Sequence, residues 1–391
     1  MIAKRTFLLG AAAAAALLAV APPLHAQDTV KVGLILPMTG PFASTGRQID
    51  AAVKLYQAQN GTTVAGKKVE VIVKDDTGTP DLTKRLAQEL VVNDKVSFLA
   101  GFGLTPLALA ATPIATQAKV PEVVMAAATA TITEASPYVV RTSMTLPQVT
   151  TPVADWAAKN GIRKAMTMVA DYGPGIDAEK AFTEALTKHG GAVESLRVPL
   201  RNPDFAPFLQ RVADAKPDAL FVFVPSGIGS IFMKQFVERG LDKSGVKLIG
   251  TGDMTDDDLL NDMGDVALGA VTSFHYSAAH PSAENKAFVD SFKKMHSMRP
   301  NFMAVAGYDG MHLIYEALKK TNGATGGDAL VAAMKGMSWT SPRGPISIDP
   351  QTRDIIQNVY IRKVERMDGE LYNVEFDMVP NVKDPVKAAK K

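Results

Sequence analysis

The chain has 391 residues, with 42 Lys and Arg residues, 40 Asp and Glu residues, and no cysteine. That length exceeds what one hydrophobic core normally supports, so we expect two domains. The balanced charge gives nucleic acid no basic surface to bind, and the lack of cysteine excludes disulfides and thiolate-bound metals. Beyond the first 26 residues, no segment of the sequence is long and apolar enough to span a membrane.

The first 26 residues have the pattern of a secretory signal peptide. Lys4 and Arg5 form a basic head, and Phe7–Val20 is an apolar run too short for a comfortable membrane span. Ala26 offers a small residue at which a signal peptidase could cut. We therefore expect residues 1–26 to be removed on export. The mature protein is then expected in the periplasm, with no lipid or membrane anchor.

Short apolar runs and amphipathic segments alternate through the first third of the chain. Strands are expected at 30–36, 68–74, 96–100 and 122–125. Helices are expected between them, such as one whose apolar face carries Ile49, Ala52, Val53 and Tyr56. Strands that alternate with helices predict a parallel sheet with right-handed crossovers.

The same alternation starts again after residue 147. Strands are expected at 164–169, 192–198, 219–224 and 247–249. Two helices, 283–294 and 305–319, then follow without a strand between them, and the chain ends in expected strands at 346–348, 359–364 and 371–376. The sequence therefore predicts an α/β protein with two Rossmann-like lobes and a chain that crosses back between them.

The stretch from Val96 to Thr129 predicts a binding shelf. Two neighbouring strands are each followed by a loop of small residues, at 101–105 and 126–129. In open α/β sheets, ligands bind at the carboxyl edge of the strands. Free backbone N–H groups and threonine hydroxyls suit an anion there, most simply a carboxylate. Alternatively, Thr105 only caps the helix that begins beside it.

The order of three motifs resembles the branched-chain amino-acid-binding family, the periplasmic receptors typified by the leucine/isoleucine/valine-binding protein. The motifs are PMTGPFASTG at 37–46, VIVKDDTGTP at 71–80, and the region 101–133 that ends in Thr-Ile-Thr. The resemblance runs from about Asp28 to the C-terminus. It implies a periplasmic-binding-protein type I fold with three crossover segments. Such a protein closes on a small solute and passes it to the membrane subunits of an ABC importer.

The resemblance also implies how the lobes divide. Lobe 1 is expected to contain residues 28–146 and 274–341, and lobe 2 residues 147–273 and 342–391. The expected hinges lie near 145–147, 272–274 and 341–344. We expect the protein to act as a monomer.

In the family that the chain resembles, the first lobe holds the ligand carboxylate at positions that match Thr105, Ala127, Ala128 and Thr129. The second lobe supplies a tyrosine, matched here by Tyr172. Amino-acid binders add a second tyrosine, but Pro225 stands near that position. They also use an acidic residue for the ligand ammonium, and Asp253 is the candidate here.

Two features of the sequence bear on the chemistry of the ligand: the missing second tyrosine, and the flat side chains near the expected site. A buried ammonium without partners costs several kcal/mol, so the missing tyrosine weakens the amino-acid interpretation. Flat side chains crowd the predicted rims, namely Phe42, Phe102, Tyr172, Phe274, His275 and Tyr276. We predict an aromatic or otherwise bulky apolar carboxylate, such as a benzoate-like acid. The alternatives are a branched-chain amino acid as ligand, and rings that pack in the hinge and core.

Other functions find little support in the sequence. The four residues Asp253 and Asp256–Asp258 lack the glycine and glutamate of a calcium loop, and Asp256 is expected to cap a helix. The loop 40–46 matches neither a dinucleotide fingerprint nor a P-loop, so we expect no cofactor. The sequence carries no H-E-x-x-H or G-x-S-x-G motif, so we expect neither metal nor catalysis. A sensory subunit for a signalling receptor stays open as a rival function.

Overall fold

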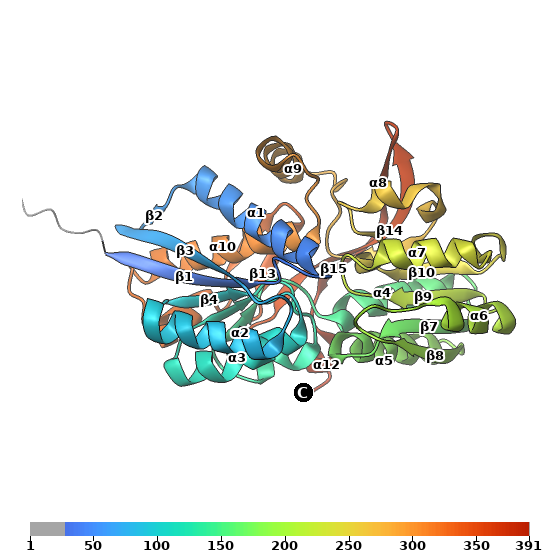
Figure 1. Cartoon of the computed structure of the whole chain (residues 1–391), viewed down its shortest axis with the longest axis horizontal. Helices are drawn as coiled ribbons and strands as arrows, with labels where there is room; N and C mark the ends of the chain where they lie inside the picture. Colours follow the sequence, from blue (N-terminus) through green and yellow to red (C-terminus); the bar gives the residue numbers. More distant parts are fainter. Residues whose placement is uncertain (1–27, 391) are drawn as a thin grey trace, which may run out of the picture.

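The computed structural model describes residues 28–390, in which two α/β lobes lie side by side (Figure 1). The expected signal peptide, residues 1–26, lies outside the described residues. Each lobe has its own parallel-rich sheet, which confirms the predicted fold class. Within residues 28–390, no helix combines the length and apolar character that crossing a bilayer requires.

The first sheet contains β1 (Thr29–Leu36), β2 (Thr63–Val64), β3 (Lys67–Asp75), β4 (Phe98–Gly101), β5 (Glu122–Val124) and β6 (Val139–Arg141). Its strand order is β2-β3-β1-β4-β5-β6, and its neighbours run parallel except β2 and β3. Strands β4 to β6 are buried on both faces, as their apolar runs predict.

Helices cover both faces of the first sheet (Figure 1). One layer pairs the first helix of the chain with a helix that returns from much later in the sequence, and the other layer pairs α2 with α3. The helices of this lobe are α1 (Ala43–Asn60), α2 (Pro80–Glu89), α3 (Thr105–Ala118), α9 (Ala283–His296), α10 (Phe302–Lys320) and α11 (Gly327–Met334).

The second sheet contains β7 (Lys164–Ala170), β8 (Ala192–Val198), β9 (Ala219–Phe223), β10 (Lys247–Thr251), β11 (Val271–Phe274), β12 (Ser338–Ser341), β13 (Gly344–Ile348), β14 (Ile355–Met367) and β15 (Glu370–Val382). Its order is β12-β13-β14-β11-β10-β9-β7-β8, with β15 paired to β14. Strands β7 to β11 are parallel, and the strands from the C-terminal tail join them antiparallel.

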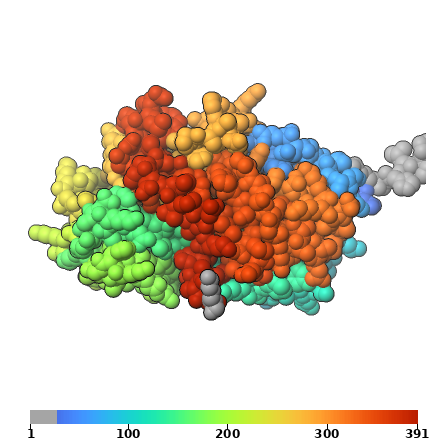
Figure 2. Space-filling model, turned by 180° about the vertical axis from the view of Figure 1, so that it is seen from behind, coloured from blue at the N-terminus to red at the C-terminus, as the bar shows by residue number. Residues whose placement is uncertain are grey.

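The helices of the second lobe are α4 (Leu146–Lys159), α5 (Gly173–Lys188), α6 (Ala206–Ala215), α7 (Gly229–Glu238), α8 (Leu260–Met263) and the C-terminal α12 (Pro385–Ala388). Short turns lie at η1 (Leu90–Asp94), η2 (Ala130–Glu134), η3 (Leu241–Lys243), η4 (Gly252–Thr255) and η5 (Gly264–Ala267). From behind, the last part of the chain covers the junction of the two lobes (Figure 2).

The chain passes between the sheets three times, after β6, after β11 and before β12. Thr145 marks the first passage, because its side chain caps α4 in a capping box with Gln148. Strand β12 hydrogen-bonds within the second sheet, although it falls inside the stretch 274–341 assigned to lobe 1. The lobe boundaries from the sequence stay a prediction.

Two local expectations are wrong. Leu104, not Thr105, is the N-cap of α3, and the Thr105 hydroxyl bonds Thr129 instead of the helix backbone. Leu259, not Asp256, is the N-cap of α8, and the Asp256 carboxylate accepts hydrogen bonds from Ser226 Oγ at 2.7 Å and from Gly227 N at 2.8 Å. In both cases a partner distant in sequence competes with the local backbone for the side chain.

Candidate ligand-binding site

A cavity lies between the lobes, where strand ends of the two sheets face each other. Its free volume is small, about 20 Å³, so the two walls lie close together in this structure. Both lobes contribute to its lining, which consists of Thr45, Gly103, Leu104, Thr105, Ala126, Ala127, Ala128, Met144, Leu146, Tyr172, Pro174, Phe223, Pro225, Ser226, Asp253 and Met303.

The first-lobe wall follows β4 and β5. Gly101 ends β4 at a positive φ of 105°, where a Cβ would lie only 2.4 Å from the Ile35 carbonyl oxygen, so the turn requires glycine. The chain then enters α3, whose first N–H groups have no partner within the helix. Beside them lie the alanines after β5 and the Thr105 hydroxyl, 2.9 Å from that of Thr129. This wall offers hydrogen-bond donors and a helix N-terminus to an anion.

The second-lobe wall is mostly apolar. Tyr172 is the N-cap residue of α5, and its ring stacks on Phe223 with centroids 6.1 Å apart and an interplanar angle of 14°. Pro174 and Pro225 line the same wall. Flat rings and prolines form a slot suited to an aromatic ring, since offset-stacked rings attract beyond their buried area.

A carboxyl group interrupts the apolar wall. Asp253 stands in η4 after β10 and is only 3 % exposed, yet it lines the cavity. Thr251 Oγ1 donates to its Oδ2 at 2.9 Å. Burial raises the pKa of Asp253 to about 7, and Asp253 in turn helps burial to raise the pKa of Tyr172. Both polar groups line the cavity.

Of the residues that the sequence analysis named, the cavity brings together Thr105, Ala127, Ala128, Tyr172, Pro225 and Asp253. Thr129 stands behind Thr105 as its hydrogen-bond partner. Several lining residues from distant segments were not predicted from the sequence, chiefly Phe223, Ser226, Met144 and Met303. Phe223 and Ser226 flank Pro225 at the end of a predicted strand, so the strand-end rule could have found them.

The other rings that the sequence analysis named lie outside the lining. Phe42 is buried beside Arg201, whose guanidinium carbon is 5.8 Å from the ring centroid. Phe102 has a left-handed backbone conformation (φ 67°), and its ring is buried in the core of the first lobe. His275 packs against Phe274 and Phe302, and burial lowers its pKa. The buried Tyr276 packs edge-on to Phe288. These rings fill the core and the junction of the lobes.

The lobes touch each other around the cavity. Ser44 Oγ of α1 donates to Asp258 Oδ2 at 2.9 Å, and Ala130 N donates to Asp177 Oδ2 of α5 at 2.8 Å. Arg201 Nη2 donates to the Gly78 carbonyl. These contacts cross from one lobe to the other, so the structure has the closed arrangement.

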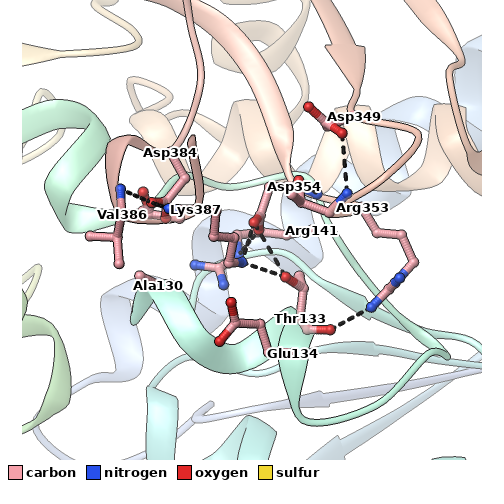
Figure 3. A network of polar contacts seen from close by, with 12 residues as sticks. Ala130, Thr133, Glu134, Arg141, Asp349, Arg353, Asp354, Asp384, Val386 and Lys387 are labelled. Atoms are coloured by element: carbon pink, nitrogen blue, oxygen red, sulfur yellow. Dashed lines mark hydrogen bonds and ion pairs between the residues drawn. The ribbon is translucent and has the colours of Figure 1, made fainter. Parts of the chain in front are cut away.

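A buried ionic network supports the loop that carries Thr129 (Figure 3). Arg141 is fully buried, with its Nε 3.0 Å from Asp354 Oδ1. Its Nη2 donates to the Thr129 carbonyl at 2.7 Å, and its Nη1 donates to the Met144 carbonyl at 2.9 Å. Lys387 of α12 pairs with the same Asp354. The network thus links the C-terminal segment to two segments of the site.

The sequence model of a family described as periplasmic binding protein matches residues 29–370. The chain belongs to the periplasmic binding protein family. The Leu/Ile/Val-binding protein homolog 6 of Brucella melitensis is 46 % identical over 364 residues, which cover 92 % of this chain and 93 % of that protein. The resemblance to the branched-chain amino-acid-binding family is confirmed. Proteins of this kind are solute-binding proteins of ABC transporters and are not enzymes.

Several solved structures with the same fold are complexes with aromatic acids. A solute-binding protein from Rhodopseudomonas palustris BisB5, in complex with 3,4-dihydroxybenzoic acid, is 68 % identical with a TM-score of 0.91, covering 92 % of this chain and 99 % of that one. An R. palustris protein in complex with 4-hydroxybenzoate is 42 % identical with a TM-score of 0.90, covering 93 % and 100 %. Another, in complex with benzoate, is 29 % identical with a TM-score of 0.85, covering 92 % and 98 %.

Proposed function

We propose that this protein binds a small aromatic carboxylate, of the hydroxybenzoate class, in the periplasm and delivers it to the membrane subunits of an ABC importer. The observation that carries the proposal is the cavity itself, with hydrogen-bond donors on one wall and a slot of flat side chains on the other. Solute-binding proteins up to 68 % identical to this chain hold benzoate derivatives, which supports the same ligand class here.

In the proposed complex, the ligand carboxylate lies at the first-lobe wall. Thr105 and the backbone of Ala127 and Ala128 hold it at the start of α3. The ring then lies against Tyr172 and Phe223 of the second lobe. A ligand that touches both lobes stabilises the closed arrangement and shifts the open–closed equilibrium toward it. The membrane subunits recognise that closed form.

A branched-chain amino acid is the second candidate, because a carboxyl group, Asp253, lines the cavity and could pair with an ammonium. Pro225 argues against it, since its side chain offers the ammonium no acceptor. Isothermal titration of protein stripped of bound ligand, with 4-hydroxybenzoate, benzoate and leucine, distinguishes the two. We expect micromolar or tighter binding of the aromatic acids, which corresponds to about −8 kcal/mol. Binding of leucine alone would overturn the proposal.

The remaining parts of the proposal concern the mature protein. N-terminal sequencing of protein isolated from the periplasm is expected to give a chain that begins near Gln27, after cleavage at Ala26. Light scattering is expected to give the mass of a monomer, with and without 4-hydroxybenzoate. A ligand-sensing subunit would instead be retained by a receptor when the importer genes are deleted.

A further inference from the structure

We propose that Asp253 recognises a ring hydroxyl of the bound acid, on the side of the ring away from the carboxylate, and so selects hydroxylated benzoates over benzoate. This inference rests on the proposed function. It identifies the ring hydroxyl as the part of the ligand that the second lobe recognises. It assigns to Asp253 a role in specificity for a neutral hydroxyl group rather than for an ammonium.

Asp253 and Thr105 lie on opposite walls of the cavity. Asp253 comes from the second lobe, at the end of β10, whereas Thr105 comes from the first lobe at the start of α3. A ligand that bridges the lobes therefore meets donors at one side and a carboxyl group at the other. Two carboxylates in contact would repel each other, so the acid group of the ligand points away from Asp253.

The carboxyl group of Asp253 can accept a further hydrogen bond. Thr251 donates to its Oδ2, its own backbone N–H also bonds it, and the charge of the buried Arg362 acts on it, but within residues 28–390 no ion pair includes this carboxyl group. A buried carboxyl group gains stability from each added donor, because burial has removed it from water. A phenolic O–H supplies one donor of that kind, whereas the bare C–H of benzoate supplies none.

Two other polar groups lie on the same wall. The Ser226 hydroxyl lines the cavity and donates its only hydrogen to Asp256 at 2.7 Å, so it can accept a hydrogen bond from the ligand but has none left to donate. Tyr172 lines the cavity on the same wall. Asp253 lines the same cavity, and its charge adds to the burial that raises the pKa of Tyr172. Tyr172 and Asp253 together can therefore serve one hydroxyl, or the two adjacent hydroxyls of a 3,4-dihydroxy acid.

The test compares three acids on matched variants. Isothermal titration is done with 4-hydroxybenzoate, 4-fluorobenzoate and benzoate, where fluorine has about the size of a hydroxyl but donates no hydrogen bond. The variants are Asp253→Ala, Asp253→Asn and the control Asp171→Asn, an exposed carboxyl group one residue before Tyr172. At pH 8, above the pKa of about 7 of Asp253, the wild type is expected to prefer 4-hydroxybenzoate to 4-fluorobenzoate by about 10- to 100-fold, the range of one hydrogen bond to a charged group.

In Asp253→Ala, we expect that preference to fall to within about threefold, while benzoate binds as well as before or better because a buried carboxyl group is gone. Asp253→Asn is expected to keep part of the preference, since its amide oxygen still accepts. The control is expected to match the wild type. Equal loss of affinity for all three acids in Asp253→Ala, or a wild type that does not distinguish them, would overturn the inference. Wild-type protein that binds no aromatic acid would instead overturn the proposed function.

Discussion

The hydroxyl oxygens of Thr105 and Thr129 lie 2.9 Å apart, at the point where two neighbouring strand ends of the first lobe meet. Thr105 begins α3, and Thr129 precedes η2. Arg141 holds the Thr129 carbonyl from the other side. A hydroxyl held in this way is already oriented when a ligand arrives, so less rotational freedom is lost on binding.

Thr105→Ala is expected to weaken binding of 4-hydroxybenzoate about 10-fold, because it removes one hydrogen bond to the ligand carboxylate. Thr105→Ser keeps the hydroxyl and is expected to stay within about threefold of the wild type. Titration calorimetry measures both affinities. Circular dichroism is the control for folding. Unchanged affinity in the alanine variant would remove Thr105 from the site.

Tyr172→Ala is expected to weaken binding of every aromatic acid about 10- to 100-fold, since the ring that stacks on Phe223 is lost. Tyr172→Phe keeps the ring and should bind benzoate as the wild type does. Dissociation constants for benzoate measure the contribution of the ring alone. If Tyr172→Phe loses as much benzoate affinity as Tyr172→Ala, stacking is not what Tyr172 contributes.

Gly173→Ala is expected to oppose closure. A Cβ at this position of the second lobe would lie 2.5 Å from the Thr129 hydroxyl oxygen of the first lobe. The clash exists only when the lobes meet, so we expect weaker binding and an unchanged melting temperature of the ligand-free protein. Gly326→Ala is the matched control, because nothing lies within 4 Å of its added Cβ. Small-angle scattering with saturating ligand would show a more extended Gly173→Ala protein, and wild-type affinity would contradict this reasoning.

Arg201→Ala is expected to speed ligand release severalfold without changing the order of ligand preference. Arg201 reaches from the second lobe to the Gly78 carbonyl and the Phe42 ring of the first, and it does not line the cavity. Its contacts therefore add to the stability of the closed form only. Stopped-flow fluorescence measures the release rate. Arg211→Ala is the control, since Arg211 pairs with Glu194 inside one lobe. An altered preference among acids would show that Arg201 acts on the ligand.

Glu122→Gln is expected to stabilise the protein at high pH. Glu122 is fully buried in β5, its carboxyl oxygens lack hydrogen-bond partners among the described residues, and burial raises its pKa to about 8. The folded state therefore holds the proton more tightly than the unfolded state, whose pKa is near 4.5. Stability contributed by the protonated form is complete below pH 4.5 and is lost as the pH rises toward 8.

The glutamine variant does not titrate, so its advantage in free energy of unfolding over the wild type should grow by about 4 kcal/mol between pH 5 and pH 9. Urea denaturation at both pH values measures it. Glu184→Gln, at an exposed position, is the control. A difference that stays constant with pH would mean that Glu122 is ionised or solvated in the folded protein.

The sequence by itself determined the alternation of strands and helices, because periodicity and chain breakers act over a few residues. It also predicted Thr105 as a candidate site residue, since Thr105 follows a strand at the carboxyl edge of its sheet, where ligands bind. Tyr172 and Asp253 were named from the resemblance to the branched-chain amino-acid-binding family. The ionic network of Arg141 could not be found in this way, because its partners come from segments far apart in the chain.

Only the tertiary structure decided which side chains face the cavity. Phe42, Phe102, His275 and Tyr276 follow strands or begin helices as the site residues do, yet their rings are buried elsewhere. The direction of a ring at a strand end depends on the helices that pack beside it, and those helices come from other parts of the chain. The lobes close through contacts such as Ser44 with Asp258, which are 214 residues apart in sequence. No local pattern encodes such a pair, because only the folded lobes bring the two side chains together.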